Sequence, residues 1–159
     1  NAQDDSLSFE LPQVNLRYIN ERTIFAMAHK DVRYYLNGLL LETGAGRLRA
    51  VATDGHRLAL CDCEAGIEAD NTHQVIVPRK GVLELARLMT DESTNVRISL
   101  GSNYIRATGP DFTFTSKLVD GKFPDYDRVL PRGGDKLVTA QRQTLREALN
   151  RASILSNEK

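Results

Sequence analysis

The sequence is poor in cysteine: among 159 residues only Cys61 and Cys63 occur, two positions apart. Cysteines at i and i+2 rarely reach the geometry of a disulfide, which excludes the disulfide framework of a small secreted protein. We therefore expect a cytoplasmic protein. A Cys-x-Cys pair needs further ligands to hold a metal ion, and His29, His56 and His73 lack the spacing of a zinc site. We expect neither a metal nor a cofactor.

Long apolar runs are also absent. No stretch approaches the roughly 20 residues that cross a bilayer, and the polar, acidic residues 1–6 do not form a signal peptide. We therefore expect no membrane association. The chain does not begin with Met, and we expect it to be part of a longer gene product. Its length suits one domain with a real core, and its 41% hydrophobic and 26% charged residues are typical of a soluble globular protein.

Neither sign of charge is in excess, because the net charge is +0. The distribution is uneven: residues 12–30 and residues 78–90 each hold three cations and one acidic residue, so each segment carries +2 and the remainder −4. A charged helix face is usually solvated surface, which is the favoured interpretation from the pattern alone. The alternative is that both segments present cations to one shared anionic partner.

Catalytic motifs are missing as well: there is no Gly-rich phosphate loop, nucleophile elbow or pair of carboxylates. Asp54, His56 and Arg57 could be imagined as acid–base groups, with Cys61 as the nucleophile. However, His56 and Cys61 fall on one predicted strand at an odd offset, so their side chains should face opposite sides. We expect no enzyme.

The chain does contain one pattern twice, a strand, a helix and three strands. The first copy is predicted at residues 8–11, 12–28, 35–42, 47–53 and 56–63. The second copy is predicted at residues 74–77, 78–89, 95–100, 103–108 and 111–118. A duplicated β-α-β-β-β unit predicts an α+β fold with two helices on one side of antiparallel sheet.

Helical spacing assigns an apolar face to each predicted helix. The first face consists of Val14, Tyr18, Ile19, Phe25 and Ala26, and the second of Val82, Leu85, Ala86 and Met89. Pro12 and Pro78 are each expected in the first turn of a helix, where a missing N–H costs nothing.

The remaining residues change in character. Residues 120–135 are rich in Pro, Gly and Asp, which predicts a linker. A possible strand at 136–140 and a helix from 141 to about 156 follow, as at the start of a third copy without its three further strands. We expect residues 1–9 to be a polar lead with the start of the first strand, 10–119 the central domain, and 136–159 the beginning of a truncated further domain.

The hairpin at residues 51–59 joins two β-prone runs at Asp54-Gly55. An Asp-Gly pair predicts a tight turn, because Gly supplies positive φ and Asp tolerates it. The turn does not explain why His56 and Arg57 follow it.

Five segments in this order resemble the bacterial DNA polymerase III β sliding clamp family: residues 27–38, 51–59, 75–81, 114–126 and 154–159. The resemblance covers essentially the whole chain. It implies the middle domain of a three-domain clamp and the first strand and helix of the third. It also implies a DNA-clamp fold whose helices line a hole around duplex DNA, a head-to-tail homodimer when full length, and a role in DNA replication without covalent chemistry.

The resemblance further implies two sites. A pocket for short peptides of DNA polymerases, the clamp loader and repair proteins would consist of Leu36, Thr53, Gly55, His56, Arg57, Leu58, Pro124, Arg128 and Val129. DNA would be contacted by Lys30, Arg33, Tyr34, Tyr35, Arg79 and Lys80.

The far pocket wall and the ring-closing surfaces belong to other parts of a clamp, so this chain alone should be a monomer with weak peptide affinity. The alternative is a free-standing DNA-binding or small-ligand-binding module. Zero net charge and the lack of a recognition-helix motif disfavour free-standing DNA binding.

Overall fold

The computed structural model describes residues 7–68, 70 and 72–155. The chain divides into two compact units, Asn1–Pro124 and Asp125–Lys159, each of which is considered by itself. Among the described residues, no helix combines the length and apolar character needed to cross a membrane.

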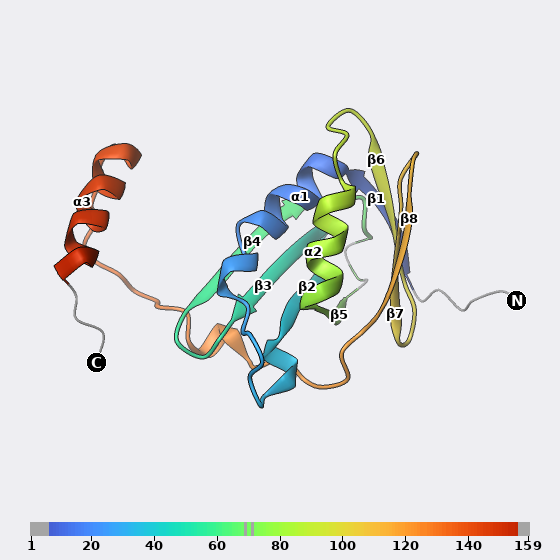
Figure 1. The fold of residues 1–159 in the computed structure, drawn as a ribbon, viewed down its shortest axis with the longest axis horizontal. Helices are drawn as coiled ribbons and strands as arrows, with labels where there is room; N and C mark the ends of the chain where they lie inside the picture. The colour runs from blue at the N-terminus through green and yellow to red at the C-terminus, as the bar shows by residue number, and fades with distance from the viewer. Residues whose placement is uncertain (1–6, 69, 71, 156–159) are drawn as a thin grey trace, which may run out of the picture. The chain divides into compact units, whose positions relative to one another are not determined.

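The first unit contains the duplicated pattern that the sequence predicts (Figure 1). The first copy comprises β1 (Leu7–Pro12), α1 (Gln13–Glu21), β2 (Gly38–Gly44), β3 (Arg47–Thr53) and β4 (Leu58–Glu64). The second comprises β5 (His73–Pro78), α2 (Arg79–Leu88), β6 (Asn95–Leu100), β7 (Tyr104–Thr108) and β8 (Thr113–Lys117). Short 3-10 helices, η1 (Ile24–Ala26) and η2 (Tyr34–Leu36), lie between α1 and β2. The α+β prediction is confirmed.

Two antiparallel four-stranded sheets form this unit, in the orders β1-β6-β7-β8 and β4-β3-β2-β5. Each sheet therefore takes three strands from one copy and its remaining strand from the other. In the registers, Leu7 lies opposite Leu100 and Gly38 lies opposite Pro78. The first strand of each copy is thus exchanged, and neither copy completes a sheet alone.

Helices α1 and α2 lie side by side against the β4-β3-β2-β5 sheet (Figure 1). Each follows a proline that ends a strand: Pro12 and Pro78 share a φ of −58° and stand immediately before the helix rather than in its first turn. Val82, Leu85 and Met89 of the predicted second face are buried, and Ala86 is half-buried. The two copies thus start their helices in the same way and pack them on the same sheet.

The first helix differs from its prediction in length and face. It ends at Glu21 instead of residue 28. Just after this end, the hydroxyl of buried Thr23 donates to the Ile19 carbonyl at 2.8 Å. This bond competes with the backbone bond that would continue the helix. Val14, Tyr18 and Phe25 are 37%, 46% and 59% exposed, so these three assignments were wrong. The buried stripe of α1 consists of Gln13, Leu16, Ile19 and Asn20.

Six of the eight strand starts also differ, by one to three residues, and two of these strands adjoin the candidate site. Residues 34–36 form η2, so β2 begins at Gly38 rather than at residue 35. Thr53 pairs with Leu58, which leaves residues 54–57 as a four-residue loop and not the tight two-residue turn that Asp-Gly predicts. His56 and Arg57 therefore belong to the loop and not to β4.

The second unit contains η3 (Tyr126–Arg128) and α3 (Arg142–Leu155). The helix predicted from residue 141 is confirmed, and its expected end at Ser156 lies outside the described residues. The strand predicted at 136–140 was wrong: within the described chain that segment pairs with no strand, and a β-strand needs a partner for its backbone groups.

Candidate functional site

The loop of residues 54–57 is organised by one carboxylate. Oδ1 of Asp54 accepts hydrogen bonds from the backbone N–H groups of His56 at 2.9 Å and Arg57 at 3.0 Å. These bonds lower the pKa of Asp54, and Arg57 Nε adds a contact to Oδ2 at 3.2 Å. Thr53 Oγ1 donates to the Arg57 carbonyl at 2.7 Å, and Gly55 takes a φ of +90° that favours glycine. His56 and Arg57 are presented on a fixed backbone.

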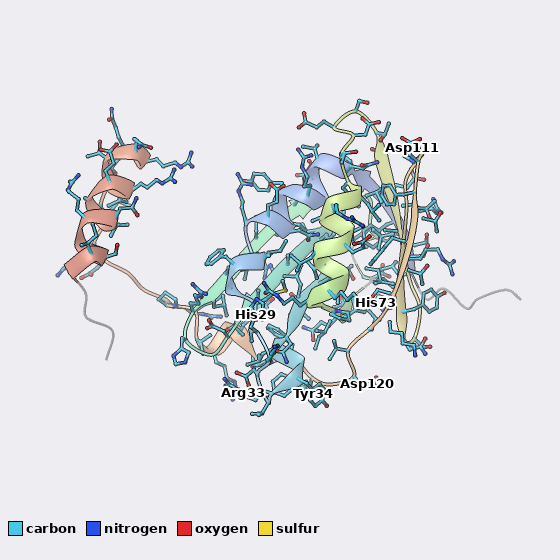
Figure 2. The ribbon with its side chains drawn as sticks, in the orientation of Figure 1. His29, Arg33, Tyr34, His73, Asp111 and Asp120 are labelled. Carbon is cyan, nitrogen blue, oxygen red and sulfur yellow. The ribbon has the colours of Figure 1, made fainter. Side chains whose placement is uncertain are left out.

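Arg33, labelled in Figure 2, donates to this loop from a neighbouring segment. Its guanidinium donates to Asp31 Oδ1 at 3.0 Å and Oδ2 at 2.9 Å, and to the Asp54 carbonyl at 3.4 Å. A Cβ atom on Gly55 would lie 2.9 Å from Arg33 Nη2, so the guanidinium rests against the glycine. The side-chain hydrogen bonds from Arg33 lower the pKa of Asp31 to about 2. Arg33, predicted as a DNA contact, is thus held against the candidate peptide site.

The segment that carries Arg33 is closed into a loop by hydrogen bonds between Asp31 and Asn37. The backbone N–H of Asp31 donates to Asn37 Oδ1 at 2.9 Å, and Asn37 Nδ2 donates to the Asp31 carbonyl, also at 2.9 Å. Within it, the rings of Tyr34 and Tyr35 meet edge to face with centroids 5.7 Å apart. This single loop contains predicted DNA contacts and one predicted pocket residue, Leu36.

The predicted peptide-pocket residues differ in exposure. His56 and Arg57 are exposed and Leu58 is half-buried at the start of β4, whereas Leu36 is only 2% exposed. Pro124 is exposed at the end of the first unit.

The last two pocket residues lie in the second unit. Arg128 in η3 pairs with Asp125 at 3.0 Å, and exposed Val129 follows it. That Arg128 and Val129 share a pocket with the loop of residues 54–57 stays a prediction.

The remaining predicted DNA contacts, Lys30, Arg79 and Lys80, lie next to the loop of residues 31–37. Exposed Lys30 takes the left-handed φ of +53°. The backbone N–H of Arg79, the first residue of α2, donates to the Asn37 carbonyl at 3.0 Å, which joins the helix start to this loop. Lys80 is exposed beside it, and no ion pair of Lys30, Arg79 or Lys80 occurs within the described residues.

Sequence reasoning missed the partners that hold the arginines. Asp31 at i−2 from Arg33 was a readable signal, because a short aspartate side chain can bond the backbone and side chain two residues on. The guanidinium of Arg57 lies 5.6 Å from the ring centroid of exposed Phe25, a contact between η1 and the loop that no local pattern announces.

The catalytic alternative gains no support from the cysteines. Burial raises the pKa of the Cys61 thiol and raises that of Cys63 to about 11, which disfavours the thiolate nucleophile. The argument from opposite strand faces does not apply, because His56 lies in the loop before β4. Across the described part of the chain, no three His, Cys, Asp or Glu side chains gather as a metal site.

Comparison with known proteins finds the family described as the DNA polymerase III beta subunit, central domain, which matches residues 10–125. The β sliding clamp of Pseudomonas aeruginosa is 66% identical over 154 residues, which are 97% of this chain and 42% of the relative. That of Escherichia coli K12 is 55% identical over 153 residues, 96% of this chain and 42% of the relative. The chain thus spans less than half the length of these relatives.

Solved structures agree in fold. The Pseudomonas aeruginosa clamp bound to griselimycin has a TM-score of 0.91 at 65% identity, over 98% of this chain and 42% of that one. The Bacillus subtilis clamp still reaches 0.89 at 26% identity, over 99% of this chain and 42% of that one.

Proposed function

Because this chain belongs to the DNA polymerase III beta subunit family, whose central domain it matches, we propose that it works as part of a DNA sliding clamp. In the proposal the full-length protein is a ring that encloses duplex DNA and tethers the replicative polymerase to it. The function is mechanical and electrostatic, so the chain itself carries out no covalent chemistry. The ring would close as a head-to-tail homodimer through surfaces outside this chain.

The pair of helices carries the proposal. Since α1 and α2 come from equivalent positions of the two copies and lie side by side on one sheet, their outward faces form one surface (Figure 1). Lys80 and Arg22 are exposed on it. Cations that neutralise phosphates hold DNA without reading its sequence, which is what a protein that slides requires.

The loop of residues 54–57 supports the second half of the proposal, a pocket for short peptides. In the proposal Leu58 and Pro124 supply apolar contacts, and His56 and Arg57 supply polar ones. A few apolar anchors with a polar rim are how small interfaces gain affinity. The griselimycin-bound clamp of Pseudomonas aeruginosa supports a ligand site on this fold. The proposed partners are DNA polymerases, the clamp loader and repair proteins.

One titration tests both halves on the full-length clamp that carries this sequence. A fluorescent peptide of the type Gln-Leu-x-Leu-Phe and a labelled duplex are titrated against wild type and Leu58→Lys. We expect wild type to bind both, and Leu58→Lys to lose peptide affinity by at least tenfold, because an ammonium group then occupies the apolar pocket. Its duplex affinity should not fall, because Leu58 is not a phosphate contact.

Thr113→Lys is the matched control, since exposed Thr113 lies on β8 in the other sheet. It adds the same charge and should leave peptide binding unchanged. Equal peptide affinity of Leu58→Lys and wild type would reject the pocket. A wild-type clamp without affinity for duplex DNA would reject the clamp function.

A further inference from the structure

Two arginines differ in their surroundings: Arg17 lies within α1, and Arg22 directly follows its last residue. Arg17 Nη2 pairs with Glu92 at 2.8 Å, Nε lies 3.7 Å from Glu21, and Nη1 donates to the Met89 carbonyl at 3.4 Å. Its side chain is only 26% exposed. Arg17 therefore ties α1 to the end of α2, and a phosphate would have to displace two carboxylates to reach it.

Arg22, in contrast to Arg17, contacts an aromatic ring instead of carboxylates within the described chain. Its guanidinium carbon lies 3.3 Å from the ring centroid of Tyr18, one turn earlier, and Nη1 makes a long bond of 3.5 Å to the Tyr18 carbonyl. No carboxylate pairs with it among the described residues. A guanidinium stacked on a ring directs its remaining N–H groups outward in its own plane, where they can donate at the edge. The stacking also limits the rotamers of a long side chain, so less freedom is lost when the group binds.

The ring of Tyr18 points away from the sheet. At 100° per residue, Tyr18 lies nearly opposite the buried stripe of Leu16, Ile19 and Asn20. Tyr18 is 46% exposed and Arg22 is exposed. Tyr18 thus belongs to the outward surface that α1 shares with α2, and exposed Arg22 is stacked on its ring.

We propose that Arg22, positioned by the ring of Tyr18, is the contact of α1 with the DNA phosphate backbone, and that Arg17 is not one. This inference rests on the proposed clamp function and goes beyond the DNA contacts expected from sequence. It makes Tyr18 a positioning residue, which acts through the guanidinium of Arg22 rather than on DNA itself.

A purely structural role for Arg22 has a different signature. Arg22 follows the last residue of α1, where a cation interacts favourably with the helix dipole. If that were its whole role, its removal would lower the melting temperature and leave DNA binding unchanged. The salt dependence of DNA binding separates the two roles, because its slope reflects how many phosphates the protein neutralises.

The experiment measures the affinity of the full-length clamp for a labelled duplex by fluorescence anisotropy over a series of salt concentrations. Each neutralised phosphate adds about 0.9 to the steepness of log K against log salt. Arg22→Ala should therefore flatten the slope by about 0.9 for each phosphate that Arg22 neutralises in wild type, and it should weaken binding severalfold at low salt. Arg17→Ala, on the same helix, should keep the wild-type slope.

Two substitutions isolate the ring. Tyr18→Ala removes no charge, yet it should weaken binding at low salt, because the guanidinium loses its support. Tyr18→Phe retains the ring and should restore wild-type affinity. Melting temperatures measured on every variant confirm that each one is folded.

The inference is overturned if Arg22→Ala keeps the wild-type slope, or if Arg17→Ala flattens it equally. Wild-type affinity of Tyr18→Ala, beside a weakened Arg22→Ala, would remove the positioning role of the ring. If the wild-type clamp shows no salt-dependent duplex binding, the clamp proposal fails as a whole, which is a distinguishable result.

Discussion

At the scale of single residues, Asp31 supports the candidate site although it is not itself predicted to touch a ligand. Its carboxylate holds the guanidinium of Arg33, and its backbone closes the loop through Asn37. Arg33 in turn reaches the Asp54 carbonyl and rests on Gly55. Residues predicted to contact ligands, on two separate loops, therefore share one structural support.

The lowered pKa of Asp31 predicts a pH dependence of stability. The carboxyl has a pKa of about 2 in the folded chain against an ordinary value of 3.8. The ionised form therefore stabilises the fold above about pH 4, and this stabilisation is lost as the pH falls towards 2. The melting temperature of Asp31→Asn should lie below that of wild type at pH 6, and the difference should shrink between pH 4 and pH 2.

Asp111→Asn is the control for this pH series. Asp111 is exposed, and Figure 2 places it at the far end of the unit from Arg33. Its substitution should leave the melting temperature close to wild type throughout. A difference for Asp31→Asn that stays constant from pH 6 to pH 2 would show that the charge of Asp31 is not what stabilises the loop.

At this scale the sequence predicted the backbone conformation of Gly55, but it did not predict the residues that hold the loop in place. The Asp54-Gly55 pair correctly indicated a positive φ at glycine, but not a four-residue loop. Loop length depends on where Thr53 and Leu58 pair, and Asp54 alone satisfies two backbone N–H groups of the longer loop. The contact of Arg33 with Gly55 joins residues 22 positions apart, and a local hydrophobic pattern cannot predict a contact over that distance in sequence.

At the scale of elements, the pairing of β2 with β5 depends on a close approach at Gly38. A Cβ atom there would lie 2.5 Å from the Val77 carbonyl oxygen and 2.9 Å from Ile76 Cγ2. Backbone on the neighbouring strand cannot rotate away as a side chain can. Glycine at this position therefore lets the first strand of the second copy join the sheet of the first.

Gly38→Ala should accordingly destabilise the chain by about 1–3 kcal/mol, the usual cost of overpacking. The free energy of unfolding in urea measures this cost. Gly134→Ala is the matched control, because a Cβ at Gly134 meets nothing within 4 Å. Equal stability of the two variants would contradict the close approach at β2 and β5.

Elements were predictable where a pattern was local. Strands at 47–53 and 95–100 were placed correctly, because alternating residues and flanking turns mark them. The face of α1 was not, because two of its four buried positions are the polar residues Gln13 and Asn20. The backbone N–H of Gln13 donates to the Thr94 carbonyl and its Nε2 donates to the Thr94 hydroxyl, each at 3.0 Å, whereas its buried Oε1 has no hydrogen-bond partner within the described residues. Thr94 lies 81 residues from Gln13, so the sequence near α1 gives no sign that this polar residue can be buried. A prediction that assigns only apolar residues to the buried face therefore selects the wrong face.

At the scale of the whole molecule, the chain should behave as a monomer. The surfaces proposed to close the ring belong to parts of a clamp that the chain, spanning 42% of its relatives, does not contain. Analytical ultracentrifugation of the 159-residue chain at micromolar concentration should therefore give a single species near 17.7 kDa. A stable species of twice that mass would show that this chain holds a self-association surface of its own.

The exchange of first strands makes each copy depend on the other. An isolated β-α-β-β-β copy would leave its first strand unpaired and one position of its sheet vacant, and an unpaired strand exposes backbone groups that readily pair with another chain. The two copies satisfy both needs by trading that strand. Because one chain holds both copies, their pairing needs no encounter in solution, and the linking segment supplies a high effective concentration instead.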